Sequence, residues 1–543
     1  MKRPEAAGGR PEVLRKTVLR RRAFLKEGAV RSAAAALALG AGPLAILRSP
    51  ESASAAAAVP REQTFVVVDG TEPNSLEPAV GTGPFQAIMN AMYDGLVTWN
   101  DKGQVVPALA TAWKPSADGR TWTFTLRPGV RFHDGTPLTA ESVRATFDRI
   151  FDKSVPATRR GNYLLIKDVA AVDDRTVRFT TDPPNPDFPL LMADVSAKII
   201  SPAAVRRYGQ DFGRHPVGTG PFTFEEWVPN DHVSAEATPD YWGPKPRVRR
   251  FVYRPIPEPA ARVVVLKTGE ADAVLNLPPA DVPGLRQTPG LTVRATPSQT
   301  IAELETADTK PPFSDVRVRQ ALNVAIDKDA IIKGIMKGFA RPLNSPGVPG
   351  LWGSVDFPPL RYDPERAKRM LAEAGYGSGM RVTVNLTSGR WAGDAQVVQA
   401  VQGYWANIGV QMTIREMAFA DLLAFSSSDP DTRPGTATCL LKGSPYIDYH
   451  LYRMYDSAAT NVPATQQRTG YANPKVDALI AAERRTFDPA ARLPILKEAQ
   501  RLVWEDQPII FLLQLVNIWG ARSGVSGFTV LPTGDFVPGR LQR

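Results

Sequence analysis

The chain has 543 residues, 43% of them hydrophobic and 22% charged, a composition that fits a soluble protein of two or three domains. A single cysteine, Cys439, excludes an intrachain disulfide framework, and the four histidines lack the paired spacing of metal ligands. Most of the net charge of +10 comes from residues 1–58, so the rest of the chain gives no support for a nucleic-acid-binding surface.

The N-terminal residues have the layout of an export signal. A twin arginine opens the motif RRRAFLK at 20–26, an Ala/Leu-rich run covers 29–47, and small residues with A-x-A cleavage options follow at 52–58. This order predicts a cleaved twin-arginine signal peptide over 1–58. A membrane anchor is the alternative, but Arg31 and Gly40 interrupt the apolar run. No cysteine lies near the cleavage region, so we expect a periplasmic protein that is not a lipoprotein.

The first half of the mature chain alternates strands and turns. Residues 64–69 predict a buried strand, and Thr82 and Gly83 precede a helix predicted over 86–93. Apolar residues alternate with polar ones over 122–127, which indicates a half-buried strand. The pair His133-Asp134 is interpreted as turn chemistry rather than as a catalytic or metal site.

A stretch just past the midpoint, 300–338, is expected to begin as a strand and to continue as one long amphipathic helix. Ser314 or Asp315 is the expected cap of that helix. A second apolar strand, predicted at 508–519, would carry the chain back, so the two strands would form two crossings between lobes. A helix predicted over 489–506 contains Pro494, which would kink it or delay its start.

The region between the two crossings has a strand–loop–helix–strand rhythm. A helix capped by Asp363 ends at Gly375, and a strand at 381–386 leads through the loop 387–394 into a helix at 395–408. This rhythm predicts a mostly parallel sheet covered by helices. Ligand sites in such sheets lie outside the carboxyl ends of strands, which is where the loop 387–394 is expected.

Four segments carry a family resemblance. They are FHDGTPLTAESV at 132–143, VGTGPF at 217–222, PDYWG at 239–243 and DVRVRQALNVAIDKDAIIKGIMKG at 315–338. The chain resembles the peptide/nickel family of extracytoplasmic solute-binding proteins (family 5), the receptors of ABC importers. The resemblance implies an α/β fold, a two-lobed clamp of the class II-like periplasmic-binding-protein type with two hinge crossings.

The resemblance also implies a domain division. Lobe I would cover 59–299, with a subdomain at 111–216, and lobe II would cover 300–508. Residues 509–543 would return to lobe I.

Candidate site residues follow from the same resemblance. In peptide-binding relatives the loop that holds Arg390 and Trp391 supplies an arginine for the ligand's carboxylate and an aromatic side chain for packing, and a guanidinium fork suits a carboxylate. A solvated loop arginine is the alternative for Arg390. Thr82 and Gly83 align with the segment that lies against the ligand backbone; a plain helix start is the alternative.

The motif around Asp448 matches the family in part. In peptide binders this aspartate pairs with the ligand's ammonium group, and a local helix or turn cap is the alternative. Tyr446 replaces the usual tryptophan, which weakens the inference of peptide specificity. Tyr446 and Tyr449 are further candidate cleft residues, whereas Trp405 is expected to face the core.

The sequence contains no GxSxG, HExxH, Walker A or Rossmann motif, so no enzyme activity, cofactor or metal site is expected. The expected function is capture of an oligopeptide or dipeptide by hinge closure and its delivery to ABC permease subunits, by a monomer that binds no nucleic acid. Alternatives in the same class are an opine, glutathione or a chelated metal. An extracytoplasmic hydrolase and a chaperone-like peptide holder are alternatives from other classes.

Overall fold

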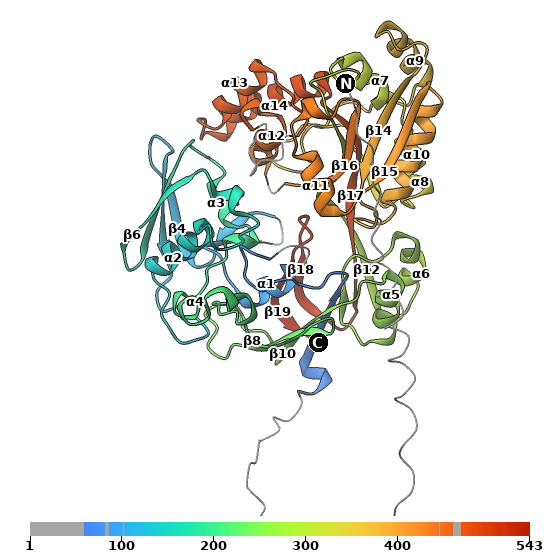
Figure 1. The fold of residues 1–543 in the computed structure, drawn as a ribbon. Coiled ribbons are helices and arrows are strands. Elements are labelled where there is room, and N and C mark those ends of the chain that lie inside the picture. Colours follow the sequence, from blue (N-terminus) through green and yellow to red (C-terminus); the bar gives the residue numbers. More distant parts are fainter. Residues whose placement is uncertain (1–58, 82–85, 101–102, 445, 460–467) are drawn as a thin grey trace, which may run out of the picture. The chain divides into compact units, whose positions relative to one another are not determined.

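Two long strands, β12 (Leu291–Thr306) and β17 (Ile509–Arg522), pair antiparallel and carry the chain through the largest sheet (Figure 1). The computed structural model describes residues 59–81, 86–100, 103–444, 446–459 and 468–543. The largest sheet has 11 strands in the order β15-β14-β16-β12-β17-β11-β1-β10-β9-β8, and β13 pairs with β17. Its other strands are β1 (Thr64–Asp69), β8 (Phe222–Val228), β9 (His232–Ala237), β10 (Arg250–Pro255), β11 (Ala273–Val274), β13 (Ala340–Pro342), β14 (Met380–Leu386), β15 (Val410–Glu416) and β16 (Thr436–Gly443).

Three smaller sheets complete the β structure of the described residues. A four-stranded sheet has the order β4-β5-β7-β6, and two hairpins pair β2 with β3 and β18 with β19. Their bounds are β2 (Val97–Trp99), β3 (Val105–Pro107), β4 (Ala110–Pro115), β5 (Thr121–Leu126), β6 (Ile166–Asp173), β7 (Thr176–Thr181), β18 (Ser526–Val530) and β19 (Phe536–Gln542).

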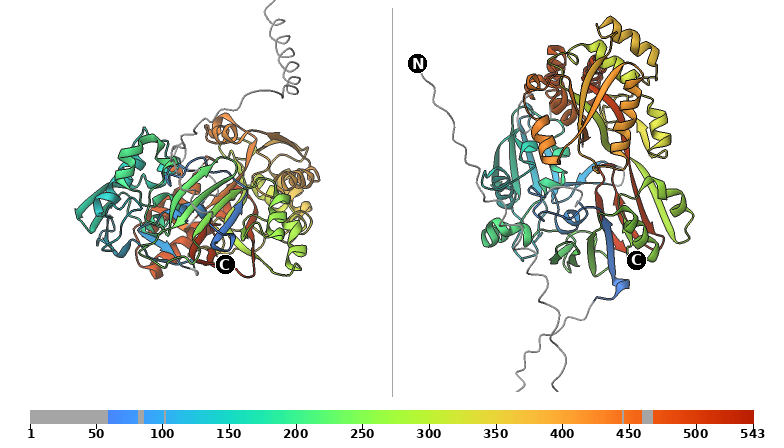
Figure 2. Two further views of the ribbon diagram at one scale, coloured as in Figure 1. Left: turned by 90° about the horizontal axis from the view of Figure 1, so that it is seen from below. Right: turned by 45° about the vertical axis from the view of Figure 1, so that its right-hand side comes forward.

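Helices cover the sheets on both sides of the long strands. Before β12 in the chain come α1 (Gln86–Met92), α2 (Ala140–Phe151), α3 (Phe188–Met192), α4 (Pro202–Tyr208), α5 (Pro259–Thr268) and α6 (Val282–Arg286). Between β12 and β17 come α7 (Val316–Val324), α8 (Lys328–Gly334), α9 (Pro364–Glu373), α10 (Asp394–Ala406), α11 (Phe419–Ser426), α12 (Ile447–Tyr455), α13 (Pro474–Glu483) and α14 (Pro489–Asp506). In Figure 2 the orange helix α10 lies against the β14–β15 end of the sheet, and α8 packs near β13.

The largest sheet is mixed, so the expectation of a mostly parallel sheet is wrong for the sheet as a whole. β14 runs parallel to β15 and β16, and β1 runs parallel to β10 and β11. The remaining pairs in this sheet are antiparallel. β12 and β17 run through it in opposite directions, and β8, β9 and β10 are consecutive strands that pair with one another in order. The strand–loop–helix–strand rhythm therefore predicts the parallel pairing of β14 with β15, which α10 connects, but not the direction of the other strands.

The single long helix expected after residue 314 is also wrong, because the chain forms two helices there. The Asp315 side chain accepts a hydrogen bond from the Arg317 amide at 2.9 Å and caps α7. The Asp327 side chain accepts one from the Ala330 amide at 2.8 Å and caps α8. A second N-cap carboxylate within the apolar pattern therefore ends one helix and begins another.

Other local predictions are confirmed. The Asp363 side chain caps α9, and Trp405 in α10 is fully buried, with its indole N–H donating to the Leu322 carbonyl at 3.1 Å. The helix predicted over 489–506 is also confirmed as α14, but it begins at Pro489, so the alternative that Pro494 delays its start is wrong.

The four-stranded sheet holds the alternation expected at 122–127. Trp122, Phe124 and Leu126 are buried and face the core of this part of the protein. His133 lies in a nearby turn, with its Nε2 atom 3.0 Å from the Gly220 carbonyl oxygen. This contact joins two loops, which confirms the structural interpretation of His133.

Candidate ligand-binding site

A cavity of about 270 Å³ lies at the carboxyl end of β14, where the loop 387–393 leads into α10. The sheet geometry places it where α/β proteins commonly bind ligands. We call it the β14 cavity. The side chains of its lining that carry charge or an aromatic ring are Arg390, Trp391, Asp394, Phe419, Lys442 and Arg468.

Arg390 presents its guanidinium group in this cavity. The Cζ atom lies 3.7 Å from the centroid of the Phe419 ring, so the planar group is stacked on an aromatic face. Partial burial of the head group lowers the pKa of Arg390, and Asp394 opposes that shift, so the side chain stays charged at neutral pH. No described carboxylate forms an ion pair with it.

Asp394 fixes the loop without forming an ion pair with Arg390. Its Oδ2 atom accepts hydrogen bonds from the backbone amides of Arg390 at 2.7 Å and Trp391 at 3.3 Å, and its Oδ1 atom accepts one from Ala395 at 2.7 Å. These bonds use the carboxylate at the N-terminus of α10, where a negative charge is favoured. The loop therefore holds Arg390 and Trp391 in a defined position.

Two further cations in the cavity were not predicted from the sequence. The Nζ atom of Lys442, on β16, lies 2.5 Å from Glu305 on β12, and Arg468 lies 3.9 Å from the same carboxylate. Burial lowers the pKa of Lys442 to about 8, although Glu305 opposes this. The usable sequence signal was the presence of Glu305 and Lys442 beside apolar residues, since such charged residues need partners when buried.

Glu303, two residues before Glu305, lies behind this pair. Burial and the neighbouring Glu305 raise the pKa of Glu303 to about 8, so its carboxyl group is mostly protonated at neutral pH. Neither of its oxygens has a hydrogen-bond partner among the described residues. Glu303 therefore adds little negative charge near Lys442.

A second cavity, of about 220 Å³, lies beside α12, and we call it the α12 cavity. Its lining combines residues that flank the four-stranded sheet with residues of the second lobe. The lining includes Asn162, Tyr446, Asp448, Tyr449, Tyr452, Arg453 and Arg484.

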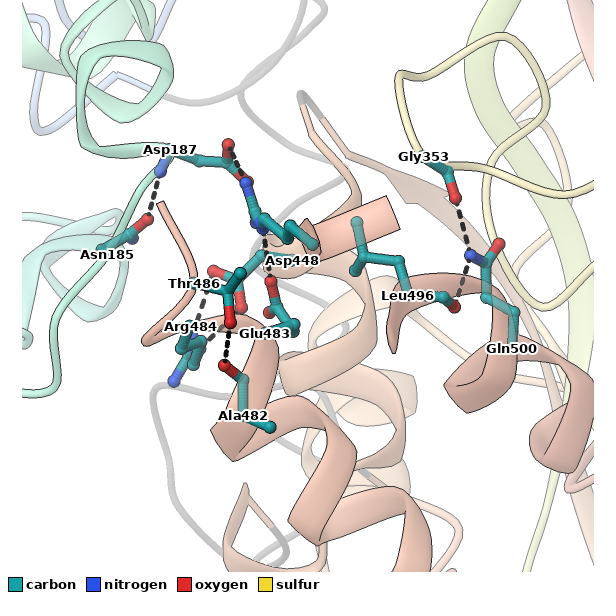
Figure 3. Close-up of polar contacts among 11 residues, drawn as sticks. Asn185, Asp187, Gly353, Asp448, Ala482, Glu483, Arg484, Thr486, Leu496 and Gln500 are labelled. Atoms are coloured by element: carbon teal, nitrogen blue, oxygen red, sulfur yellow. Dashed lines mark hydrogen bonds and ion pairs between the residues drawn. The ribbon is translucent and has the colours of Figure 1, made fainter. Parts of the chain in front are cut away.

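Asp448 is fully buried and paired within the protein (Figure 3). Arg484 donates from Nε to Oδ1 at 2.6 Å and from Nη2 to Oδ2 at 3.3 Å. Burial raises the pKa of Asp448, but Arg484 and its neighbours lower it by more, so the pKa lies below its usual value. The Arg484 guanidinium also lies 3.8 Å from the centroid of the Tyr452 ring. The sequence singled out Asp448 but missed Arg484, which is distant in the chain.

A second ion-pair cluster adjoins Asp448. Arg492 donates to both oxygens of Asp187, at 2.7 and 2.6 Å, and to Glu483 at 2.7 Å. Figure 3 shows Glu483, Arg484 and Asp448 close together beside Asp187. Burial and the Asp448 carboxylate raise the pKa of Glu483 well above its usual value. The cluster links the loop before α3 to α13 and α14.

The remaining sequence candidates separate into different places. The Tyr446 and Tyr449 rings make an edge contact at 5.5 Å, and the Tyr449 hydroxyl donates to Asn162 Oδ1 at 3.0 Å. Thr82 and Gly83 lie outside the described residues. The structure thus groups Arg390 with Trp391 in one cavity, and Asp448 with the two tyrosines in the other.

Metal clusters and membrane-spanning helices are both absent from the described part of the chain. Within it, no three His, Cys, Asp or Glu side chains are grouped so that they could hold a metal ion. Within the same residues, no helix combines the length and apolar character needed to cross a membrane.

A comparison with protein families matches residues 104–473 to the model of bacterial extracellular solute-binding proteins, family 5. The chain belongs to this family. As a family 5 protein it is a substrate-binding protein of the kind that binds small ligands and works with ABC permeases. The prediction of the family from sequence motifs is confirmed.

Individual relatives agree with the family and the fold. The family 5 protein is 32% identical over 493 residues to the glutathione-binding protein GsiB of Pectobacterium atrosepticum, covering 90% of this chain and 94% of the relative. The periplasmic binding protein DppA of Helicobacter pylori, solved with the peptide STSA, matches with a TM-score of 0.77 and 26% identity over 88% of this chain and 98% of that one. MoaA of A. tumefacien R10, solved with mannopinic acid, matches with a TM-score of 0.75 and 27% identity over 88% and 99%. The two-lobed fold is therefore confirmed, and these relatives are binding proteins.

Proposed function

We propose that this family 5 protein is a periplasmic receptor that captures a short peptide, or a peptide-like molecule of similar size, and delivers it to the permease of an ABC importer. The observation that carries the proposal is the β14 cavity, in which a stacked arginine without a carboxylate partner among the described residues lies beside a tryptophan. The glutathione-binding and peptide-bound relatives support the same ligand size. The absence of catalytic motifs from the sequence supports a binding protein rather than an enzyme.

Arg390 is the proposed partner of a ligand carboxylate, because its planar fork bonds both oxygens of such a group. Trp391 would pack against the ligand, and Tyr446 and Tyr449 would line the neighbouring α12 cavity. A bond between Asp448 and a ligand ammonium stays a prediction from the sequence, and it competes with the ion pair to Arg484. The roles of Thr82 and Gly83 also stay predictions.

Ligand capture would use hinge closure between lobe I, 59–299 with 509–543, and lobe II, 300–508. Support comes from the pairing of β12 with β17, whose register shifts between Pro297 and Ile301 and again between Ala302 and Glu303. Such irregularities bend and twist a strand pair locally. A ligand that contacts both lobes would stabilise the closed state, which is the form the permease would recognise.

The proposed route to the periplasm is twin-arginine export. The motif at 20–26 and the small residues at 52–58 support cleavage near residue 58, and the lack of a cysteine there supports a protein without a lipid anchor. We further propose that the mature protein acts as a monomer and binds no nucleic acid.

The test is to purify the mature protein, release the compounds that co-purify with it and identify them by mass spectrometry. A true ligand binds with a stoichiometry of one and raises the melting temperature as its concentration increases. The proposal would be abandoned if the released compound were chemically converted by the protein, or if only unfolded polypeptides bound.

A further inference from the structure

The β14 cavity holds more positive charge than its own carboxylates neutralise. Arg390, Lys442 and Arg468 all line it, whereas Asp394 is the one carboxylate in its lining, and that group is engaged by three backbone amides. Glu305 lies behind the lining and serves two cations at once, Lys442 at 2.5 Å and Arg468 at 3.9 Å. Arg390 has no ion-pair partner among the described residues. A cavity of this kind favours an anionic occupant.

Burial makes this excess of positive charge significant. The Lys442 side chain is 2% exposed and the Arg468 side chain 11% exposed, so water does little to screen either charge. Glu303 is close by but mostly protonated, and so it does not balance them. Arg390 is already oriented by Phe419 before any ligand arrives. Three oriented donors around one space of about 270 Å³ suit more than one anionic group.

The lining of the α12 cavity also contains a partly buried cation. Arg453 lines it and donates to Asn162 Oδ1 at 3.1 Å. Burial, together with the positive charges of Arg468 and Arg159, lowers the pKa of Arg453 to about 10. Cations from both cavities are therefore close enough to repel one another, and an anion between them would relieve that repulsion.

The residue expected to accept a ligand's ammonium group is already occupied. Asp448 has both oxygens on Arg484, and the Arg484 guanidinium is held over Tyr452 (Figure 3). An ammonium group that displaced Arg484 would leave a buried guanidinium without its partner. The structure therefore offers strong sites for anions and no ready site for a free ammonium at Asp448.

We infer that the ligand is a polycarboxylate: a compound with two or more carboxylates, bound through Arg390, Lys442 and Arg468, whose affinity does not depend on a free ammonium group at Asp448. This inference rests on the proposed receptor function and narrows its ligand class. According to this inference, zwitterionic dipeptides with one carboxylate are not the ligands that bind most tightly. Amino-acid conjugates and acidic peptides with two or more carboxylates are the expected ligands.

The first test compares small probes by isothermal titration calorimetry on the mature protein. L-glutamyl-L-glutamate has three carboxylates and an ammonium group, N-acetyl-L-aspartyl-L-glutamate has three carboxylates and none, and L-alanyl-L-alanine has one carboxylate and an ammonium group. Both tricarboxylates are expected to bind at least about tenfold more tightly than the neutral dipeptide, which corresponds to one charge-assisted contact. Their affinities should weaken with added salt.

The second test removes cations one at a time. Arg390→Gln and Arg468→Gln are each expected to weaken binding of a tricarboxylate about tenfold or more. Arg468→Gln should change binding of alanyl-alanine less, because the single carboxylate of that dipeptide would bind Arg390. Arg501→Gln is the matched control, because Arg501 is exposed on α14 and pairs with Glu498 at 2.7 Å. The paired change Asp448→Asn with Arg484→Gln removes the ion pair without leaving one charge alone, and it should leave tricarboxylate affinity within about threefold.

Three results would overturn the inference. The first is that alanyl-alanine binds as tightly as the tricarboxylates, and the second is that N-acetylation abolishes binding. The third is that pyrophosphate binds while neither tricarboxylate does, which would assign the cations to phosphate. In each case a stoichiometric co-purifying ligand would leave the receptor function standing, so the two proposals fail separately.

Discussion

The Arg492 cluster allows one prediction to be worked through in detail. The Arg492 side chain is 4% exposed and binds both oxygens of Asp187 as well as Glu483. Arg492, on α14, therefore compensates the buried negative charge of Asp187, which precedes α3. Replacing it with methionine keeps most of the side-chain volume but leaves Asp187 buried without its partner. Removal of one member of a buried ion pair destabilises a protein by about 3–5 kcal/mol. The loss falls mainly on Asp187, because it accepts two of the three hydrogen bonds and Glu483 accepts one.

The effect should be visible as a melting temperature shift. The entropy of unfolding is about 2 cal/mol/K per residue, or about 1 kcal/mol/K for a chain of roughly 500 residues, so a loss of about 3–5 kcal/mol lowers the melting temperature by about 3–5 °C. The assay is calorimetry of Arg492→Met against Arg501→Met, an exposed arginine of the same helix. A double-mutant cycle with Asp187→Asn should recover much of the loss, since the uncompensated charge is then absent. Equal melting temperatures for the two arginine variants would refute the reasoning.

Three further predictions concern single side chains. Burial lowers the pKa of Lys328 to about 7, so between about pH 7 and pH 10 only the unfolded chain holds the proton on this side chain. The unfolding free energy of the wild type should therefore rise with pH relative to that of Lys328→Met, by at most about 1.4 kcal/mol per pH unit. If urea titrations gave a difference between the two proteins that does not vary with pH, this reasoning would be contradicted. Trp405→Ala should lower the unfolding free energy by about 3–5 kcal/mol, because the indole is fully buried; a loss under about 1 kcal/mol would show that the site repacks. Gly220→Ala would place a Cβ atom 2.4 Å from backbone at the end of α1 and should lower the melting temperature, whereas Gly284→Ala, with open space around it, should not; equal effects would argue against that close approach.

Local features of the fold were predictable because their causes are local. The helix α9 begins at an Asp-Pro pair and ends before a glycine at φ +89°, and each of these residues has one dominant structural role. The buried strand at 64–69 follows from an unbroken apolar run. The break between α7 and α8 was missed because Asp327 reads equally well as an exposed helical residue or as an N-cap. The mixed direction of the sheet depends on pairings between strands that are more than two hundred residues apart.

The candidate site was predictable only in part for the same reason. Arg390 and Trp391 lie in one loop, so sequence position alone places them together. The pairing of Asp448 with Arg484, and of Lys442 with Glu305, depends on how separate elements pack. A sequence reveals that a buried charge needs a partner, but the tertiary fold decides whether that partner is a ligand or another residue.

The order of the strands also has a consequence for biosynthesis. The strand β11 has its second neighbour only when it pairs with β17, through Val274 and Gly520. The ring of Phe536 on β19 packs with its centroid 6.0 Å from that of Phe65 on β1. A nascent chain that has not reached residue 509 therefore exposes an unpaired strand edge and an incomplete aromatic core. Ribosome-bound chains should therefore depend on chaperones until β17 and β19 emerge, and prematurely terminated chains should depend on them throughout. The lobe that is translated first can complete its folding only after the C-terminal strands have been made.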